Sequence, residues 1–371
     1  MKFSAYKQDF ADAINAASIA VAVKPNTPIL AGIYICATGS MVELQCNNFT
    51  TGCVVRFPVN VEREGIIVVD CRRLKDFIAK LPDDTLTAEL KDNYLTIESG
   101  GAKVELLTFN AADFPKIKRV EESVCSTNIP ANDLRAMINR TAFAVAADET
   151  RPIFTGINFQ FSDDDSLRLV ATNTHRLAFQ GHGRLELDEN KITKKFAVPA
   201  NALRGIAQQL NPNSFDEVNI VFGHCFAEFT FDNKFITTRL LEGEFPPTDR
   251  VIPHETATHI KVGAEAFSKA LNYVAIMSKE TESNTAILTL NSEGIQITAN
   301  SEQVGEANVN VEAEFSGEDL RIAFNVKYLL DVLKIWDSPW MLLDFNSKHS
   351  PCKITAPDDT NYIYVVTPIR V

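Results

Sequence analysis

The sequence predicts an α+β protein of three tandem domains, each about 125 residues long. The first observation is a strand motif, apolar at alternate positions and ending in small polar residues, at residues 42–48, 167–173 and 295–301. Its copies are 125 and 128 residues apart, and a helical motif recurs with offsets of 129 and 126 residues. Two independent markers with one period make chance agreement improbable. The predicted domains are residues 1–125, 126–256 and 257–371.

The helical motif predicts one buried-face helix in the second half of each domain. Its apolar residues have i, i+3, i+4, i+7 spacing. They are Leu74, Phe77, Ile78 and Leu81, then Leu203, Ile206, Ala207 and Leu210, then Leu329, Val332, Leu333 and Trp336. Another helical pattern precedes each strand motif. The six expected helices are residues 6–22, 71–81, 131–145, 200–210, 264–280 and 326–336.

The first domain divides into two similar halves when its elements are taken in order. Strands read as alternating apolar and polar residues, and Gly39-Ser40 and Asp92-Asn93 supply turns. The expected order is strand 1–6, helix 7–21, strands 30–37, 41–48 and 51–60, then strand 65–70, helix 71–81, and strands 85–91, 94–99 and 102–109. Each domain is therefore expected to be two β-α-β-β-β halves, with helices covering one face of antiparallel sheets.

Charge gives mixed information about partners. The chain of 371 residues has a net charge of −12, which disfavours general adhesion to phosphate backbones or anionic membranes. The six expected helices nevertheless carry a net +5 and the rest of the chain −17, with helix 71–81 alone at +3. Basic residues on a solvated helix face are the ordinary alternative explanation.

Local motifs give no support for an enzyme. The sequence has no Gly-rich phosphate loop, no nucleophile elbow and no zinc-binding pair of histidines. Asp163, Asp164 and Asp165 read as a solvated hairpin loop rather than a metal site. Seven scattered cysteines indicate reduced thiols in a cytosolic protein, and no signal peptide or membrane span is expected. We predict no catalytic residue, cofactor or metal, although an acid–base pair assembled across the fold would leave no local motif.

Five segments carry a resemblance to a known family along the whole length of the chain. They are Lys24–Leu30, Phe143–Pro152, Thr172–Leu177, Glu242–Pro253 and Val365–Val371. Together with the three repeats, they resemble the bacterial DNA polymerase III β subunit family, the replicative sliding clamps. The resemblance implies a non-catalytic processivity factor that encircles duplex DNA in the bacterial cytoplasm, at the nucleoid. Its implied partners are the clamp loader, the replicative polymerase catalytic subunit and other proteins with a clamp-binding motif.

The resemblance also implies an assembly: a head-to-tail homodimer ring with twelve helices lining the hole and sheets outside. Strand Val104–Leu106 would meet Ile276 and Met277 of a second copy. For Ile276 and Met277, ordinary core packing is the equal alternative.

The family's peptide pocket and DNA contacts carry over by position. The pocket wall would be Phe154, Thr172, His175, Arg176, Leu177, Pro246, Val251, Pro351, Val365, Thr367 and Arg370. The DNA contacts would be Lys24, Arg72 and Arg73. Three places depart from the family pattern: Asn173-Thr174 where Asp-Gly is common, Thr367 where a larger apolar residue is common, and Ala200-Asn201 where some members are basic.

Two rival functions remain open to the sequence. One is a repeat scaffold that binds proteins without encircling DNA, and the other is a hydrolase that uses scattered Asp, Glu and His residues. If the chain is a sliding clamp, we expect Arg176→Ala to abolish peptide binding and to leave the dimer intact.

Overall fold

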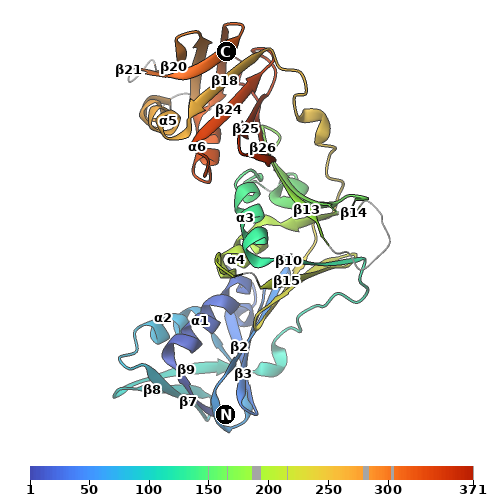
Figure 1. Ribbon diagram of the computed structural model, residues 1–371. Coiled ribbons are helices and arrows are strands. Elements are labelled where there is room, and N and C mark those ends of the chain that lie inside the picture. The colour runs from blue at the N-terminus through green and yellow to red at the C-terminus, as the bar shows by residue number, and fades with distance from the viewer. Residues whose placement is uncertain are drawn as a thin grey trace. The chain divides into compact units, whose positions relative to one another are not determined.

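The computed structural model describes residues 1–148, 150–164, 166–185, 194–214, 216–278, 284–301 and 305–370 (Figure 1). Four predicted features therefore lie outside the described residues: Glu149 of the 143–152 motif, Asp165 of the acidic hairpin, residues 279–280 of the fifth helix, and Val371.

The described helices number six and follow the predicted positions. They are α1 (Lys7–Ala17), α2 (Cys71–Ala79), α3 (Ala131–Ala142), α4 (Ala200–Gln209), α5 (Ala264–Ser278) and α6 (Val326–Leu333). Each begins directly after a strand, and two have side-chain caps: Asp70 accepts from Arg73 N at 2.8 Å, and Asn325 accepts from Lys327 N at 2.9 Å. Several end earlier than predicted, because tighter 3₁₀ turns close them; α1, for example, continues as Ser18–Ala20.

The strands of the first repeat are β1 (Lys2–Tyr6), β2 (Gly32–Thr38), β3 (Met41–Asn47), β4 (Thr51–Pro58), β5 (Asn60–Arg63), β6 (Gly65–Asp70), β7 (Thr85–Lys91), β8 (Tyr94–Ser99) and β9 (Ala102–Phe109). The central repeat has β10 (Cys125–Pro130), β11 (Gly156–Phe161), β12 (Ser166–Thr172), β13 (Arg176–Arg184), β14 (Lys194–Pro199), β15 (Glu217–Phe222), β16 (Phe226–Phe231) and β17 (Lys234–Arg239). The third has β18 (Thr258–Gly263), β19 (Thr285–Asn291), β20 (Gly294–Ser301), β21 (Gly305–Val311), β22 (Ala313–Gly317), β23 (Leu320–Asn325), β24 (Trp340–Phe345), β25 (Cys352–Ala356) and β26 (Asp359–Val366).

Two local predictions were wrong. The predicted strand 51–60 is two strands, because the chain leaves β3 after Pro58 and β5 pairs with β1 instead. Phe77 is not on the buried face of α2: it is 43% exposed, while Cys71, Leu74 and Ile78 form the buried stripe. Phe77 lies at the rim of that stripe, where a helical period alone does not separate core from surface.

The two halves of each repeat exchange their first strands. In the first repeat, β6 of the second half pairs with β2, and β1 of the first half pairs with β7. The same exchange gives β14–β11 and β10–β15 in the central repeat, and β23–β19 and β18–β24 in the third. The sheets of each repeat are therefore built from strands of both halves.

Sheets also continue from one repeat into the next. The sheet that starts at β10 joins the first repeat through β17–β4, and the sheet that starts at β14 joins the third through β13–β26. The chain consequently forms two compact units that divide the central repeat. The first is mainly Met1–Arg135 with Asn201–Leu240, and the second is mainly Ala136–Arg184 with Leu241–Val371.

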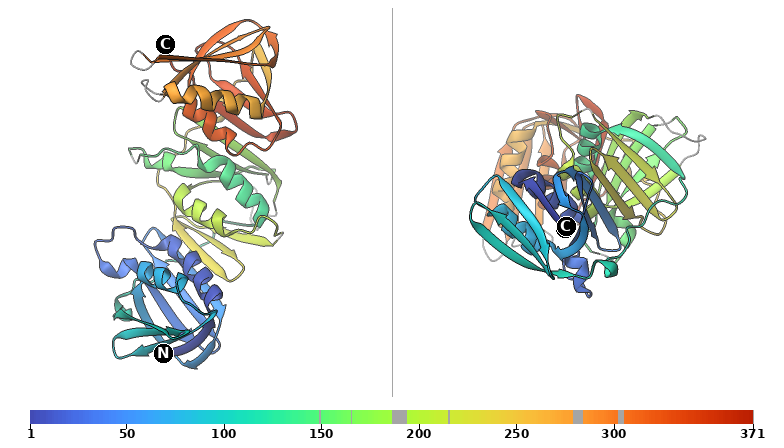
Figure 2. Two further views of the ribbon diagram at one scale, coloured as in Figure 1. Left: turned by 90° about the vertical axis from the view of Figure 1, so that its left-hand side faces the viewer. Right: turned by 90° about the horizontal axis from the view of Figure 1, so that it is seen from below.

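Helices cover one face of the sheets in each unit. Figure 2 shows α1 beside α2 and α5 beside α6, as their packing contacts require. In the first repeat the ring of Phe10 packs 5.7 Å from the rings of both Phe3 and Phe57. All three side chains are buried, and burial of such a ring contributes about 1.5–3 kcal/mol.

Candidate functional site

The register of β13 against β26 brings together the predicted pocket residues of the second unit. Leu177 pairs with Val365, and Arg176 pairs with Val366. The next residue, Thr367, donates both its backbone N–H and its hydroxyl to the carbonyl oxygen of His175, each at 2.9 Å. The antiparallel ladder thus places two segments that are almost 200 residues apart in sequence on one surface.

An apolar cluster forms the floor of this surface. Phe154, Leu177 and Val365 are buried together with two residues that the sequence prediction missed, Val170 and Phe245. The rings of Phe154 and Phe245 meet edge to face at 6.1 Å. Phe245 stands inside the Glu242–Pro253 motif, so its position beside Pro246 was the available signal.

The rim of the surface is more exposed. Pro246 is exposed and Val251 is 42% exposed, and both belong to the segment that follows β17. Pro351 is half-buried and directly precedes β25, whose first residue Cys352 pairs with Val366. We call the surface formed by the buried cluster and this rim the β13–β26 groove, after the peptide pocket that the resemblance implies at these residues.

A tight turn directly precedes β13 and fixes where this strand begins. The Asn173 side-chain oxygen accepts from the N–H groups of His175 at 3.1 Å and Arg176 at 3.0 Å. The Thr172 hydroxyl donates to the carbonyl oxygen of Arg176 at 2.6 Å. Thr174 takes a left-handed conformation with φ of 75°, which glycine adopts without strain and a β-branched residue does not. This geometry explains why Asp-Gly suits these two positions.

Arg176 is a framework residue of the groove. It is 8% exposed, and its guanidinium donates to Asp331 at 2.8 Å and to the carbonyl oxygen of Phe143 at 2.5 Å. The same guanidinium lies over the Tyr328 ring, 4.6 Å from its centroid. If an Arg176→Ala variant lost peptide binding, the first cause would therefore be the loss of the contacts from Arg176 to Asp331 and Phe143, which hold the groove in shape.

Asp331 and Tyr328 are the functional neighbours that sequence reasoning missed. Burial opposes the charge of Asp331, but hydrogen bonds from Lys334 and Arg176 outweigh it and hold the pKa of this carboxyl below its ordinary value. Tyr328 also stacks on His175, with ring centroids 6.4 Å apart. Both residues lie on α6, where the helical pattern predicted only packing.

Arg370 lies outside the apolar floor. The chain turns after Thr367, and the N–H of Ile369 donates to the carbonyl oxygen of Ala323 at 2.8 Å. Arg370 is exposed just beyond this contact, beside Arg321 and Lys348.

The first unit contains a junction with the same register but a different surface. Gly52 pairs with Thr237 as Leu177 pairs with Val365, and Arg239 N donates to the carbonyl oxygen of Thr50 at 2.8 Å. The Asn48 side chain closes the same kind of turn, and Phe49 there has a φ of 69°.

Residues 115–120, which we call the strap, lie across this first junction. A Cβ added to Gly52 would meet Ile117 Cγ2 at 2.7 Å, so Ile117 occupies the space of the missing side chain. Arg119 stacks 3.8 Å over the Phe235 ring and donates to Glu228 at 3.0 and 3.3 Å. The strap therefore covers the first junction through Ile117 and Arg119.

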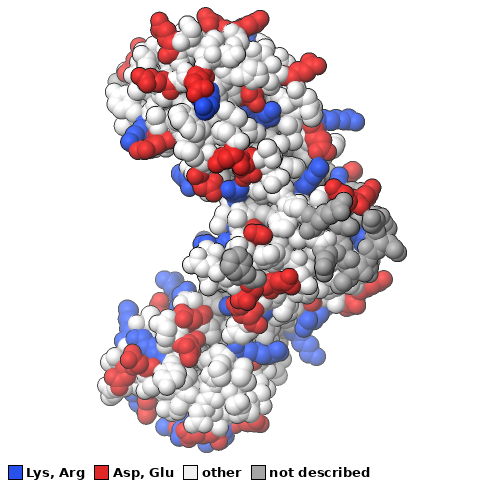
Figure 3. Space-filling model, in the orientation of Figure 1, with Lys and Arg blue, Asp and Glu red and all other residues white. Residues whose placement is uncertain are grey.

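The predicted DNA contacts are exposed on the first unit. Arg72 and Arg73 lie in the first turn of α2, and Lys24 lies in the loop between Ser18–Ala20 and Pro28–Ala31. Figure 3 shows Lys and Arg side chains at the edge of the first repeat near α2, with acidic groups interspersed. Other helical cations are engaged: Arg140 pairs with Asp337 and Asp359 at 2.8 and 2.7 Å. The net helical charge of +5 therefore overstates the basic surface.

The predicted dimer residues differ in accessibility. Ile276 is 63% exposed and Met277 is half-buried, so Ile276 does not pack in the core of its own repeat. Val104 is half-buried, whereas the Leu106 side chain is only 7% exposed and its neighbour Leu107 is 62% exposed. Sequence reasoning missed Leu107, which the strand alternation places on the opposite face from Leu106.

Other kinds of site find no positive support in the part of the chain that the structure describes. No group of three or more His, Cys, Asp or Glu side chains there could hold a metal ion. None of the helices described is both long enough and apolar enough to cross a membrane.

Comparison with known proteins identifies the family. Models of the N-terminal, central and C-terminal domains of the DNA polymerase III beta subunit match residues 1–118, 128–247 and 249–370. The beta sliding clamp of Bacillus subtilis is 30% identical over 381 residues, which cover all of both chains. The crystal structure of the Bacillus subtilis sliding clamp superposes with a TM-score of 0.91 at 28% identity, covering 100% of this chain and 99% of that one. That of the Pseudomonas aeruginosa clamp bound to griselimycin gives 0.93 at 26% identity over 100% of both chains. The chain therefore belongs to the DNA polymerase III beta subunit family, the bacterial beta sliding clamps.

Proposed function

We propose that this sliding clamp closes head to tail with a second copy into a ring around duplex DNA. As an accessory subunit of a polymerase, a clamp is not itself an enzyme, and its family encircles DNA and binds polymerase and other partners. In our proposal the β13–β26 groove takes peptides from the replicative polymerase, the clamp loader and other clients in the bacterial cytoplasm. The three domains would be bounded at residues 125 and 256.

The observation that carries the ring is a rule of sheet joining that, among the described residues, leaves one edge of β21 and most of one edge of β9 without a partner strand. At both junctions one strand of a repeat's first half pairs with the last strand of the next repeat's second half: β4 with β17, and β13 with β26. The corresponding strands left over are β21 and β9. Among the described pairings, β21 contacts only β20, and β9 contacts β6 only at Thr108 and Phe109. A second copy, with its own β9 and β21, would satisfy both edges and close the ring.

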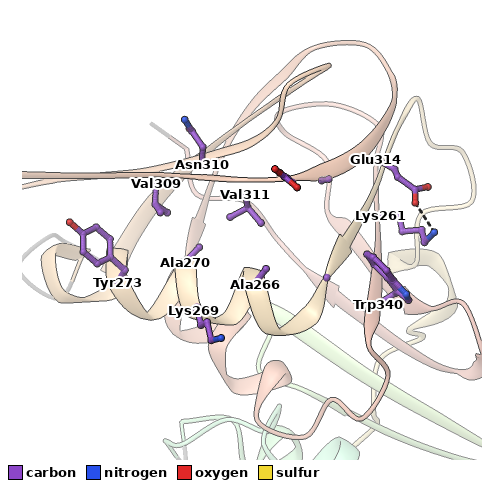
Figure 4. Close-up of a pocket in the computed structure, with 13 residues that line it drawn as sticks. Lys261, Ala266, Lys269, Ala270, Tyr273, Val309, Asn310, Val311, Glu314 and Trp340 are labelled. Carbon is purple, nitrogen blue, oxygen red and sulfur yellow. Dashed lines mark hydrogen bonds and ion pairs between the residues drawn. The ribbon is translucent and has the colours of Figure 1, made fainter.

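Exposed apolar side chains lie beside both free edges. Leu107 is 62% exposed on β9, and Tyr273 and Ile276 are 57% and 63% exposed on α5. A hollow of about 790 Å³ lies between α5 and β21 (Figure 4). Its apolar lining includes Val309, Val311, Ala266, Ala270 and Tyr273. Large exposed apolar groups next to an unpaired strand edge favour an interface over a solvated surface.

The DNA contacts that we propose are few. Lys24, Arg72 and Arg73 would each neutralise a phosphate, which changes the slope of log K against log salt by roughly −0.9 per contact. Weak contacts suit a ring that must move along its DNA, because retention then comes from encirclement.

A topological assay tests the proposal. Purified clamp is loaded onto nicked circular DNA with its loader and ATP, the loader is removed, and the circle is cut once. We expect the clamp to stay on the circle and to leave the linear product. Equal retention on both forms would show adhesion rather than encirclement, and the scaffold alternative predicts no loading on either form.

A further inference from the structure

A small basic hollow lies beside the C-terminal segment of the second unit. It has a volume of about 260 Å³, and its charged or titratable lining residues are Arg321, Lys348, His349 and Arg370. Among the residues that the structure describes, no Asp or Glu side chain lines it. Such a concentration of cations is unexpected in a chain whose net charge is −12.

Three chain segments build this hollow. Ile369 bridges to Ala323 of β23, which fixes the C-terminal segment along that strand. The turn between β24 and β25 closes through Ser350 N to the Ser347 carbonyl at 3.2 Å, and the two Ser hydroxyls are 2.8 Å apart. This turn carries Lys348 and His349, so the cations converge through backbone contacts rather than through flexible side chains alone.

The cations of the hollow differ from the other cations of the same repeat. Within the described chain, no ion pair is recorded for Arg321, Lys348 or Arg370. Elsewhere in the repeat, Lys261 pairs with Glu314 at 2.8 Å, and Lys353 pairs with Asp344 at 3.1 Å. Converging like charges repel one another, and an anion in the hollow would relieve that repulsion.

The hollow is also close to the β13–β26 groove along the chain. Thr367 bonds to His175 at the groove, and Arg370 follows three residues later. An extended chain covers about 3.3 Å per residue, so these positions are at most about 10 Å apart. A peptide seated in the groove would reach the hollow with a side chain two to four residues beyond its groove-bound segment.

We propose that this hollow binds carboxylate side chains that flank the groove-bound segment of a client peptide. The inference rests on the proposed peptide-binding function of the groove. The ligand is a protein carboxylate because the groove already brings a peptide to this place, and the hollow then favours acid-flanked clients over neutral ones.

Fluorescence anisotropy with the whole clamp tests the inference. The probe is a labelled peptide with the clamp-binding segment of the polymerase catalytic subunit from the same cell, made with an Asp-Asp-Glu flank or a Ser-Gly-Ser flank. We expect the acidic flank to tighten binding by about three- to tenfold at low salt, the range of a few exposed charge pairs. The gain should shrink at high salt.

Variants locate the effect. In Arg321→Gln/Lys348→Gln the gain should disappear, while affinity for the neutral peptide stays within about twofold of wild type. The matched control Lys269→Gln removes an exposed cation of the same repeat that pairs with Glu265, and should keep the gain. A short duplex oligonucleotide is titrated in parallel.

The outcomes separate the two proposals. Equal affinity for both flanks, or a gain that survives the double substitution, overturns the inference and leaves the groove intact. A double variant that loses oligonucleotide affinity but keeps the flank gain assigns the hollow to phosphate contacts, which also overturns it. Failure of the neutral peptide to bind wild-type clamp overturns the groove and the hollow together.

Discussion

The ion pair between Arg176 and Asp331 stabilises the elements that form the groove, and its removal should lower the local stability of these elements. In Arg176→Ala, the Asp331 side chain, 12% exposed, keeps only Lys334 as a cationic partner, which is itself 70% exposed. The carbonyl oxygen of Phe143 also loses its donor. Removing one member of a buried pair costs about 3–5 kcal/mol, and the remaining Lys334 places this case near the low end, about 3 kcal/mol.

Amide hydrogen exchange measures this cost locally, because a chain of several domains does not unfold in one step. The β13 and α6 amides should lose protection equivalent to about 3 kcal/mol. The double variant Arg176→Met/Asp331→Asn, which removes both charges, should recover at least about 1 kcal/mol of it. The control Arg168→Ala removes an exposed cation 3.9 Å from Asp249 and should change protection by less than about 0.5 kcal/mol. A loss in Arg176→Ala no larger than in this control would refute the reasoning.

The pH dependence of the same amides gives an independent check. The folded-state pKa of Asp331 is depressed, so its stabilising contribution is complete above the unfolded-state pKa, about 3.9. That contribution is lost as pH falls through the folded-state pKa. We expect wild-type β13 and α6 to lose protection below about pH 4 more steeply than Asp331→Asn. Identical acid profiles would contradict the assignment.

Two further substitutions test other parts of the structure. Thr174→Gly removes a β-branched side chain from a residue in the left-handed conformation, and so relieves backbone strain. In the same exchange experiment, we expect the amides of the 172–176 turn to gain protection equivalent to about 1 kcal/mol. Unchanged or lower protection would mean that the φ of 75° at Thr174 carries no strain. Leu107→Asp places a charge beside the proposed β9 edge and should shift the mass of the clamp in sedimentation from two chains to one. The control Val23→Asp, at a 93% exposed position outside β9, should leave the mass unchanged. A dimeric Leu107→Asp clamp would argue against the β9–β21 interface.

Local periodicity predicted most of the fold because the repeats share one pattern of buried faces. The helical spacing of Leu203, Ile206, Ala207 and Leu210 corresponds to a fully buried stripe. Periodicity failed for Phe77, because a residue at the edge of a stripe is buried or exposed according to what packs beside it. It also could not reveal the exchange of β1 and β6 between halves, since strand pairing is a long-range property.

The resemblance supplied candidate site residues but not the contacts that each of them makes. Arg176 was expected to bind peptide, yet its guanidinium is engaged by Asp331 and Phe143. The partner Asp331 lies 155 positions away in the sequence, and no local pattern around either residue indicates that the two form a pair. Arg370 was expected to line the pocket, and the resemblance did not indicate the backbone bridge at Ile369 that places it beside Arg321 and Lys348.

The two junctions show how one sheet-joining rule yields one groove rather than two. Both have the same register and the same Asn-closed turn, so backbone geometry does not distinguish them. The difference is in the side chains. At the second junction the Leu177 side chain packs in the apolar cluster, whereas at the equivalent position of the first junction Gly52 has no side chain and Ile117 of the strap occupies the space. Glu228, 7% exposed, then fixes the strap through Arg119. In the register of the second junction Lys353 stands where Glu228 does, and it pairs with Asp344 of its own sheet instead. The segment after β17 therefore lacks the carboxylate that holds the strap at the first junction, and it packs on Leu177 through the buried Phe245 instead.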